Sequence, residues 1–321
     1  MDTQHLSAIR RFNRTLTQQV GALEDSFLGR GRHLGQARLL YEIGQQGTDL
    51  RALRARLDLD SGYMSRLLRA LERQQLIKAV PSQDDARRRT VALSEKGRRE
   101  LAEYNKQSDS HARSVLDALS EEQRSKLIAA MAEVERLLVA AAIQVEIEPV
   151  ASADSTWCLQ QYYAELARRF DRGFDPALSI SASVAELTPP AGYFVVARNS
   201  GRPVGCGALK IKDARVGEVK RMWVDASVRG LGVGRRVLQS LEEQARRRGL
   251  RLLRLETNQT LKEAQALYRR NGYREVPAFN DEPYAHHWFE KTLRTTPVNP
   301  RPTRIRSDKY RRVRGRPRAR K

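Results

Sequence analysis

A short stretch with three glycines, Arg229-Gly230-Leu231-Gly232-Val233-Gly234, restricts what the second half of this 321-residue chain can fold into. Before it, residues 218–224 alternate between apolar and charged side chains, which predicts a β-strand. After it, apolar residues recur at helical spacing over 237–245 until Gly249, which predicts a helix. A strand, a glycine turn and a helix in this order bring backbone N–H groups to the positive end of a helix dipole. This arrangement predicts a pyrophosphate-binding site.

The spacing of the glycines distinguishes between kinds of phosphate-binding loop. A dinucleotide-binding fingerprint needs G-x-G-x-x-G, but no glycine follows Gly234 until Gly249. A P-loop needs Lys and then Ser or Thr after its last glycine, whereas Gly234 precedes Arg235. The remaining pattern, R-x-x-G-x-G over Arg229, Gly232 and Gly234, resembles the coenzyme A loop of the GNAT superfamily of N-acetyltransferases. A glycine-rich turn without a ligand is the alternative for the motif taken alone.

A second motif supports this resemblance. Residues 264–273 end in Leu-Tyr-x-x-x-Gly-Tyr and predict a helix closed by Gly272. A helix with Tyr162, Leu166 and Phe170 is also predicted, and strands are predicted over 144–149, 193–198, 203–210, 218–224, 252–257 and 286–293. The order of these elements is similar to the GNAT fold. The resemblance implies an α/β (α+β) fold with a central mixed, mostly antiparallel sheet, and acetyl-CoA as co-substrate.

The resemblance also implies roles for individual residues. Glu218 matches the acid that often serves as general base, and Tyr268 matches the tyrosine that protonates the departing thiolate. Backbone groups of Met222 and Val224 are expected to bind the pantetheine arm and polarise the thioester carbonyl. Strand alternation predicts that Glu218, Lys220, Met222 and Val224 share one face, where Lys220 would tune the carboxylate. The expected coenzyme-binding residues are Met222, Trp223, Val224, Arg229, Gly230, Leu231, Gly232, Val233, Gly234 and Asn258.

Simpler interpretations of these side chains stay open. Glu218 can be a solvated strand residue, and Tyr268 can be a packing residue against Tyr273. His286 and His287 are neighbours on a predicted strand, so they point to opposite faces and no metal site is expected.

The first half of the chain predicts several helices and a hairpin. Helices are predicted over 5–28, 34–43, 50–57, 97–117 and 120–141, and another begins at Asp60 or Ser61 with Leu67, Leu68 and Leu71 on its buried side. The helices on either side of residues 58–62 predict a helix-turn-helix, whose second helix enters the major groove of DNA. Residues 76–80 and 90–93 predict the two strands of a wing around the basic turn 81–89.

The wing motif Asp85-x-Arg87, followed by Leu93-Ser94-Glu95-Lys96-Gly97, makes residues 5–145 similar to MarR-family winged helix-turn-helix regulators. The resemblance implies binding to double-stranded DNA and a homodimer built from the first and last helices. The expected DNA-binding residues are Ser61, Tyr63, Met64, Arg66, Arg69, Arg87, Arg88 and Arg89. A plain helical core or protein-binding module is the alternative.

Composition limits the class of protein and its partners. The net charge of +21 favours attraction to nucleic acid or to anionic cofactors. Only two cysteines occur, so no disulfide framework is expected and a reducing cytoplasm fits. No stretch approaches the roughly 18 consecutive apolar residues of a membrane span. The basic tail, residues 294–321, is expected to be disordered. Its Arg314-Gly315-Arg316-Pro317 resembles the core of an AT-hook, although nonspecific phosphate attraction is favoured.

The sequence therefore predicts a two-domain fusion. Residues 1–143 are expected to form a MarR-like DNA-binding and dimerisation domain, 144–293 a GNAT domain and 294–321 the basic tail. The predicted function is that of a transcriptional regulator that also transfers acetyl directly from acetyl-CoA to the amine of a small molecule or protein. Two alternatives remain: a regulator whose GNAT half is a non-catalytic sensor of acyl-CoA or a metabolite, and a DNA-tethered protein acetylase.

Overall fold

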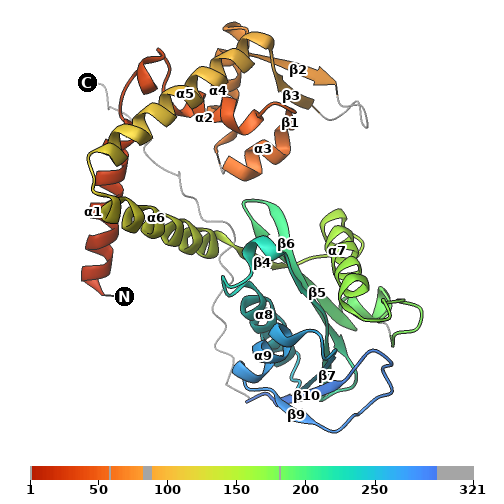
Figure 1. Cartoon of the computed structure of the whole chain (residues 1–321). Helices are drawn as coiled ribbons and strands as arrows, with labels where there is room; N and C mark the ends of the chain where they lie inside the picture. Colours follow the sequence, from red (N-terminus) through yellow and green to blue (C-terminus); the bar gives the residue numbers. More distant parts are fainter. Residues whose placement is uncertain (1, 58, 82–88, 181, 295–321) are drawn as a thin grey trace, which may run out of the picture.

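The computed structural model describes residues 2–57, 59–81, 89–180 and 182–294 (Figure 1). Its N-terminal half is mainly helical. The elements are α1 (Thr3–Gln19), the 3-10 turn η1 (Phe27–Gly29), α2 (Leu34–Ile43), β1 (Thr48–Asp49), α3 (Leu50–Leu57), α4 (Ser61–Arg73), β2 (Ile77–Pro81), β3 (Arg89–Leu93), α5 (Glu95–Asp117) and α6 (Glu121–Ala142). The three strands form an antiparallel sheet in the order β1-β3-β2. This half is the winged helix fold that the sequence predicted.

Local sequence explains most ends of these helices. The side chain of Asp60 accepts hydrogen bonds from the backbone N–H groups of Gly62 and Tyr63, so α4 begins where the sequence predicted. The prediction for the first helix was wrong at its C-terminal end. Helix α1 stops at Gln19, because Gly21 adopts a φ of +61° that no right-handed helix continues through.

Glycine at position 97 allows α5 to pack against the backbone before the wing. The Ser94 hydroxyl accepts a hydrogen bond from Gly97 N–H and donates one to the Gln75 carbonyl. A Cβ at position 97 would lie 1.9 Å from the carbonyl oxygen of Leu76. The Leu-Ser-x-x-Gly motif therefore combines a helix cap with a close approach that only glycine permits.

The C-terminal half is built on one seven-stranded sheet in the order β4-β5-β6-β7-β8-β10-β9. The elements are β4 (Gln144–Ile147), α7 (Ala153–Arg169), η2 (Ala185–Leu187), β5 (Gly192–Asn199), β6 (Arg202–Ile211), β7 (Val216–Val224), η3 (Ala226–Val228), α8 (Val233–Arg247), β8 (Leu252–Thr257), α9 (Lys262–Arg270), β9 (Arg274–Val276) and β10 (His287–Thr292). The β7–β8 pair is parallel and the other pairs are antiparallel. This is the mixed, mostly antiparallel GNAT sheet that the sequence predicted.

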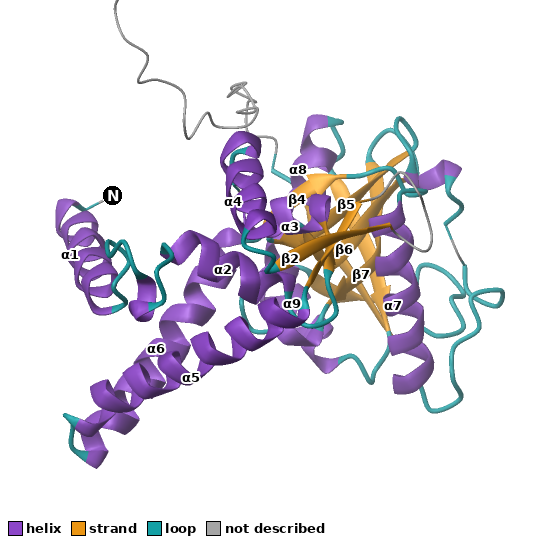
Figure 2. Ribbon diagram, turned by 90° about the horizontal axis from the view of Figure 1, so that it is seen from above, coloured by secondary structure: helices purple, strands orange, loops and turns teal. Residues whose placement is uncertain are grey.

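Two helices cover opposite faces of this sheet (Figures 1 and 2). Helix α8 packs its apolar residues, Val237 and Leu241 among them, onto a core that includes Val195 and Leu209. Helix α7 covers the other face, where Cys158 packs against Phe194 and Val196. At the start of α8, the Arg236 guanidinium donates hydrogen bonds to the carbonyl groups of Ala140 and Ile143, at the end of α6. Among the described residues, no helix is long and apolar enough to cross a membrane.

A bulge and a divergence of two strands open the sheet in the middle. Strand β7 pairs with β8 only from Val216 to Glu218, and the two strands separate beyond that point. On its other side, β7 has an extra residue opposite β6, at Arg221, which adopts a φ of +55°. Met222 has no register partner on β6 or β8.

The bulge corrects one prediction from strand alternation. Lys220 pairs with Ala208, which lies under α7, whereas Met222 and Val224 pack against the core under α8. Glu218 and Lys220 therefore do not share a face with Met222 and Val224. One extra residue in a strand turns every later side chain to the other face of the sheet.

Candidate functional site

The start of α8 presents backbone donors without partners. Gly230 and Gly232 have φ of +78° and +77°, which glycine adopts without strain. Gly232 is the N-cap, and no side chain caps the helix. Within the described part of the chain, no group accepts a hydrogen bond from the backbone N–H groups of residues 232–235. These donors and the helix dipole together suit an anionic ligand.

A groove with a volume of about 560 Å³ is lined by this turn and, on its other walls, by β7, α7 and α9. Residues 222–224 of β7 and Tyr268 of α9 belong to its lining. Four arginines and two glutamates are the charged lining residues: Arg169, Arg229, Arg235, Arg270, Glu165 and Glu263. The groove therefore combines a positively charged entrance at α8 with an apolar wall on β7, which suits an elongated ligand with an anionic end.

One acid holds an arginine of this groove in place. The Arg229 guanidinium lies 2.5 Å from Glu165 Oε2, and its Nε donates to the Val224 carbonyl at 2.9 Å. Trp223 Nε1 also donates to Glu165 Oε2, at 3.0 Å. Glu165 belongs to α7, far from the glycine motif in sequence. An anion at the α8 turn would therefore meet Arg229 in a position set by a carboxylate.

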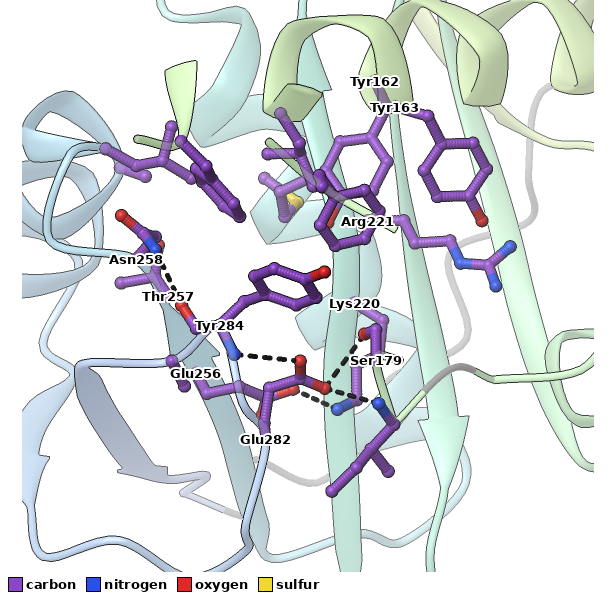
Figure 3. Close-up of a pocket in the computed structure, with 18 of the residues that line it drawn as sticks. Tyr162, Tyr163, Ser179, Lys220, Arg221, Glu256, Thr257, Asn258, Glu282 and Tyr284 are labelled. Carbon is purple, nitrogen blue, oxygen red and sulfur yellow. Dashed lines mark hydrogen bonds and ion pairs between the residues drawn. The ribbon is translucent and has the colours of Figure 1, made fainter. Parts of the chain in front are cut away.

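A second, smaller cavity of about 110 Å³ lies beside the groove (Figure 3). The two share Tyr162, Met222 and Tyr268 among their lining residues. Burial, with a smaller contribution from the Glu256 carboxylate, raises the pKa of the Tyr268 hydroxyl, so that this hydroxyl stays protonated and can donate. Groups held in the two spaces can thus meet beside a proton donor.

Tyr268 also packs as its simpler interpretation suggested. Its ring lies 6.0 Å from that of Tyr273 and 5.9 Å from that of Phe289, measured between centroids. The two interpretations of Tyr268 are compatible, because packing fixes the ring while its hydroxyl end borders both spaces.

Glu218 lies at the point where β7 and β8 pair. It is buried, and it lines neither the groove nor the smaller cavity. Lys220 Nζ lies 3.6 Å from Glu218 Oε2 and forms an ion pair with Glu256 Oε1, and Glu256 does line the smaller cavity. The ammonium of Lys220 therefore connects the predicted base to a carboxylate that the sequence did not single out.

Comparisons with known proteins identify the families that this chain matches. Residues 156–273 match the model of the acetyltransferase (GNAT) family, and residues 30–88 match that of the MarR family. The uncharacterized N-acetyltransferase YsnE of Bacillus subtilis is 38% identical over 109 residues, which are 33% of this chain and 72% of that protein. The chain belongs to the GNAT acetyltransferase family. It joins that family's fold to a MarR-family region.

Two further proteins are similar to the GNAT half. The IAA acetyltransferase of Azospirillum brasilense is 47% identical over 88 residues, and the match spans 27% of this chain and 58% of that protein. A solved structure, the acetyltransferase of the GNAT family from Staphylococcus aureus Mu50, is 19% identical, with a TM-score of 0.42 over 48% of this chain and 100% of that one.

Most residues expected to bind the coenzyme of a GNAT protein line the groove: Met222, Trp223, Val224, Arg229, Gly230, Gly232, Val233 and Gly234. Leu231 and Asn258 do not. Leu231 packs against the core under α8. Asn258 lines the smaller cavity, where its Nδ2 donates to the Tyr284 carbonyl and its Oδ1 accepts from Thr260 N–H. Groove residues that sequence reasoning missed include Glu165, Arg169, Arg235, Arg270 and Asn271.

Helix α4 of the MarR region exposes some, but not all, of the expected DNA-binding residues. Ser61, Tyr63, Arg66 and Arg69 are exposed on α4. The expectation for Met64 was wrong, because Met64 is buried in the core with Leu67 and Leu71. Positions spaced by three and four residues share one face of a helix, so these three side chains point inward together. Arg87, Arg88 and the side chain of Arg89 lie outside the described residues, as does the tail motif 314–317.

One of the two neighbouring histidines contacts an acid. His287 Nδ1 lies 2.5 Å from Glu275 Oε1, across the β9–β10 pair. Within the described ranges, no group of three or more His, Cys, Asp or Glu side chains is arranged to hold a metal ion.

Proposed function

We propose that residues 144–293 transfer acetyl from acetyl-CoA to a primary amine and that residues 1–143 bind double-stranded DNA as a homodimer. One observation carries the first part. Four neighbouring backbone N–H groups, which have no partner in the described part of the chain, open onto a groove that ends at a protonated tyrosine. Acetyl-CoA carries a pyrophosphate, a long arm and a thioester, and it supplies the activated acetyl group.

The residues present fit this co-substrate. The donors of residues 232–235 and the nearby Arg229 and Arg235 suit the pyrophosphate. The bulge at Arg221 leaves Met222 without a strand partner, so that its backbone groups can hydrogen-bond an amide-containing arm. We place the thioester beside Met222 and Tyr268, where the groove and the smaller cavity meet.

Acid–base roles follow from the same arrangement. We assign Tyr268 as the donor that protonates the departing thiolate, because its hydroxyl stays protonated. We keep Glu218 as the acceptor of the proton that leaves the amine. Since Glu218 lies behind Lys220, this proton would reach it through the ion-paired group of Glu218, Lys220 and Glu256.

Thiol release from acetyl-CoA, measured across a panel of amines and basic peptides, tests the enzymatic proposal. Glu218→Gln should lower turnover about 10²-fold or more if the carboxylate takes the proton, while the Kd for acetyl-CoA stays unchanged. Glu290→Gln is the matched control, because Glu290 pairs with Arg254 on β8 and lines neither space. Equal turnover of the two variants would exclude Glu218 as base.

The DNA-binding proposal rests on charge and on exposed side chains. The exposed Arg66 and Arg69 lie on the helix that the MarR fold presents to DNA, in a chain with a net charge of +21. Arg69→Ala should weaken binding to an operator fragment, measured by fluorescence anisotropy. A uniform loss across sequences would indicate a phosphate contact, and a loss confined to the operator would indicate a base contact.

The homodimer proposal rests on two helices that bury none of their residues, α1 and α6. Their apolar side chains are exposed and include Ile9 and Phe12 on α1 and Ile128, Met131 and Leu138 on α6. A second copy would cover them. Light scattering at micromolar concentration should give twice the monomer mass, and Leu138→Asp should lower it.

A sensor function for the GNAT half is the second candidate. The observation that favours it is the contact of Arg236, in the first turn of α8, with the last carbonyls of α6. A ligand at the α8 turn thus lies one turn from a contact with the proposed dimerisation helix. Operator affinity that changes with acetyl-CoA, in a protein that turns over none of the amines, would support the sensor.

A further inference from the structure

The smaller cavity has an aromatic wall. Four aromatic rings pack together with their centroids 4.8–5.9 Å apart: Phe174 contacts Tyr163, Phe170 and Tyr284, and Phe170 also contacts Tyr284. Tyr162 continues this wall to the groove (Figure 3). Such a wall suits an apolar or aromatic body of modest size, and it also attracts a cation that lies over a ring.

The opposite side of this cavity holds more buried negative charge than positive charge. Glu256, Glu282 and Lys220 line it, and Glu218 lies behind Lys220. Arg221 also lines the cavity, but it is only partly buried, and its guanidinium lies over the Tyr163 ring and donates to the Ala182 carbonyl. Glu218 and Glu282 are 5% and 8% exposed as whole residues, and the side chains of Lys220 and Glu256 are each 9% exposed. Lys212 also approaches Glu218, at 3.5 Å, but its side chain is 58% exposed. Three carboxylates therefore surround one buried ammonium group.

Two of these carboxylates are already provided with partners. Glu282 accepts hydrogen bonds from the Ser179 hydroxyl and from the backbone N–H groups of Ile180 and Tyr284, and so ties two walls of the cavity together. Glu218 lies between Lys212 and Lys220. Hydrogen bonds and ion pairs thus satisfy both of these carboxylates, so neither is an unpaired acceptor.

Glu256 is different. Its Oε1 pairs with Lys220, but its Oε2 is buried and has no hydrogen-bond partner among the described residues. Burial raises the pKa of this carboxyl group, Lys220 opposes the shift, and the nearby Glu218 and Glu282 add to it. An unpaired buried acceptor costs about 1–3 kcal/mol. A donor with a positive charge would remove that cost and balance the local charge.

We infer that the smaller cavity binds a compact primary amine with an apolar or aromatic body, and that Glu256 accepts a hydrogen bond from its ammonium group. This inference rests on the proposed acetyl transfer and names the class of its acceptor. An α-amino acid fits less well, because its carboxylate would lie one carbon from the ammonium, beside three buried carboxylates.

The chemistry at this position balances. The ammonium releases one proton to the carboxylate of Glu256, and its nitrogen lone pair then forms the bond to the carbonyl carbon of the acetyl group. The bond between that carbon and sulfur breaks, and the sulfur takes a proton from the Tyr268 hydroxyl. Once the carbon–nitrogen bond has formed, the nitrogen releases its second proton through solvent to the Tyr268 phenolate, and the proton on Glu256 passes to Glu218 and then to solvent. The products are an N-substituted acetamide, free coenzyme A and one proton.

Three probes of one shape test the charge requirement on the full-length chain. They are 2-phenylethylamine, its neutral analogue 2-phenylethanol, and phenylalanine, which adds a carboxylate. Calorimetry of each against the chain saturated with coenzyme A measures binding without turnover. We expect 2-phenylethylamine to bind at least tenfold more tightly than either analogue. Equal affinities for the three probes, or no binding of 2-phenylethylamine, would overturn the inference. This test uses the unaltered chain, so it does not depend on whether a variant folds.

Variants then test the residue. Glu256→Gln should weaken the binding of 2-phenylethylamine at least tenfold and leave the affinity for coenzyme A unchanged, whereas Glu290→Gln should change neither. Unchanged amine binding in Glu256→Gln would remove Glu256 as the acceptor. If the proposed acetyl transfer is wrong, the chain should not bind coenzyme A. That result differs from a failure of the amine alone to bind, so the two failures can be told apart. Tight coenzyme binding with turnover of amino acids alone would refute only the amine class.

Discussion

Replacing Gly232 by alanine separates the anion-binding role of the glycine turn from its structural role. At a φ of +77°, alanine is strained by about 1–2 kcal/mol. A Cβ at this position would have no neighbouring heavy atom within 4 Å, so no clash adds to the strain. We therefore expect the melting temperature to fall by about 2–4 °C for each kcal/mol in a folding unit of this size.

The same methyl group should weaken coenzyme binding further. Gly232 lines the groove, and its Cβ would occupy open space beside the unpaired N–H groups of residues 232–235. Displacing an anion from one or two of these donors removes charge-assisted hydrogen bonds of about 1.5–3 kcal/mol. The Kd for acetyl-CoA should then rise about 10- to 100-fold.

Gly249 provides the matched control at the other end of α8. Its φ is also +77°, and a Cβ there would likewise have no heavy atom within 4 Å. Gly249→Ala should therefore lower the melting temperature as much as Gly232→Ala and leave the Kd unchanged. Calorimetry and thermal unfolding of both variants decide the matter. If Gly232→Ala binds acetyl-CoA as tightly as Gly249→Ala, the turn is not the pyrophosphate site.

Three other predictions concern packing and charge. Gly97→Ala should destabilise by more than the roughly 1–3 kcal/mol of an ordinary overpacked core, measured by urea unfolding, because its Cβ would meet a backbone oxygen at 1.9 Å. Met64→Ala should cost about 2–5 kcal/mol of stability, whereas Arg66→Ala should change stability by less than about 0.5 kcal/mol and weaken DNA binding instead. Glu186, whose pKa is lowered to about 2 by Lys210 and Ser183, contributes stability that is present above pH 4.5 and lost toward pH 2. At pH 5 the unfolding free energies of the native chain and of Glu186→Gln should differ by less than about 1 kcal/mol, because the Glu186–Lys210 pair is partly exposed. This difference should shrink as the pH falls from 5 to 3.

Local sequence signals predicted the parts of the fold that short-range physics decides. Helices α2 and α3 occupy the predicted ranges, and Asp60 caps α4 as expected. Strands β1 and β9 were missed, because two or three residues carry no usable alternation. The burial of Met64 was available from its spacing to Leu67 and Leu71, and it was outweighed by its place near the start of the recognition helix.

The charged residues of the site depend on contacts between distant parts of the chain. Glu165 of α7 holds Arg229, and Glu282 of a late loop meets Ser179 and Ile180. In the sequence, each looks like an acid on a solvated surface, since most glutamates are exposed. No periodicity or motif connects residues more than sixty positions apart, as Glu165 and Arg229 are. Only the fold reveals that these acids are buried and paired.

The bulge in β7 shows how one local irregularity decides the chemistry of the whole site. With regular alternation, Glu218 and Met222 would face the same side, and the predicted base would lie beside the groove. The extra residue at Arg221 instead sends Met222 to the α8 side and leaves Lys220 on the α7 side, with Glu218 behind it. The strand carboxylate that lines the smaller cavity is consequently Glu256, on the neighbouring β8, and not Glu218. Arg221 is not a glycine, so the sequence gives no sign of its positive φ. Assigning a base by counting residues along a strand therefore requires that the strand be regular up to the site, and here it is not.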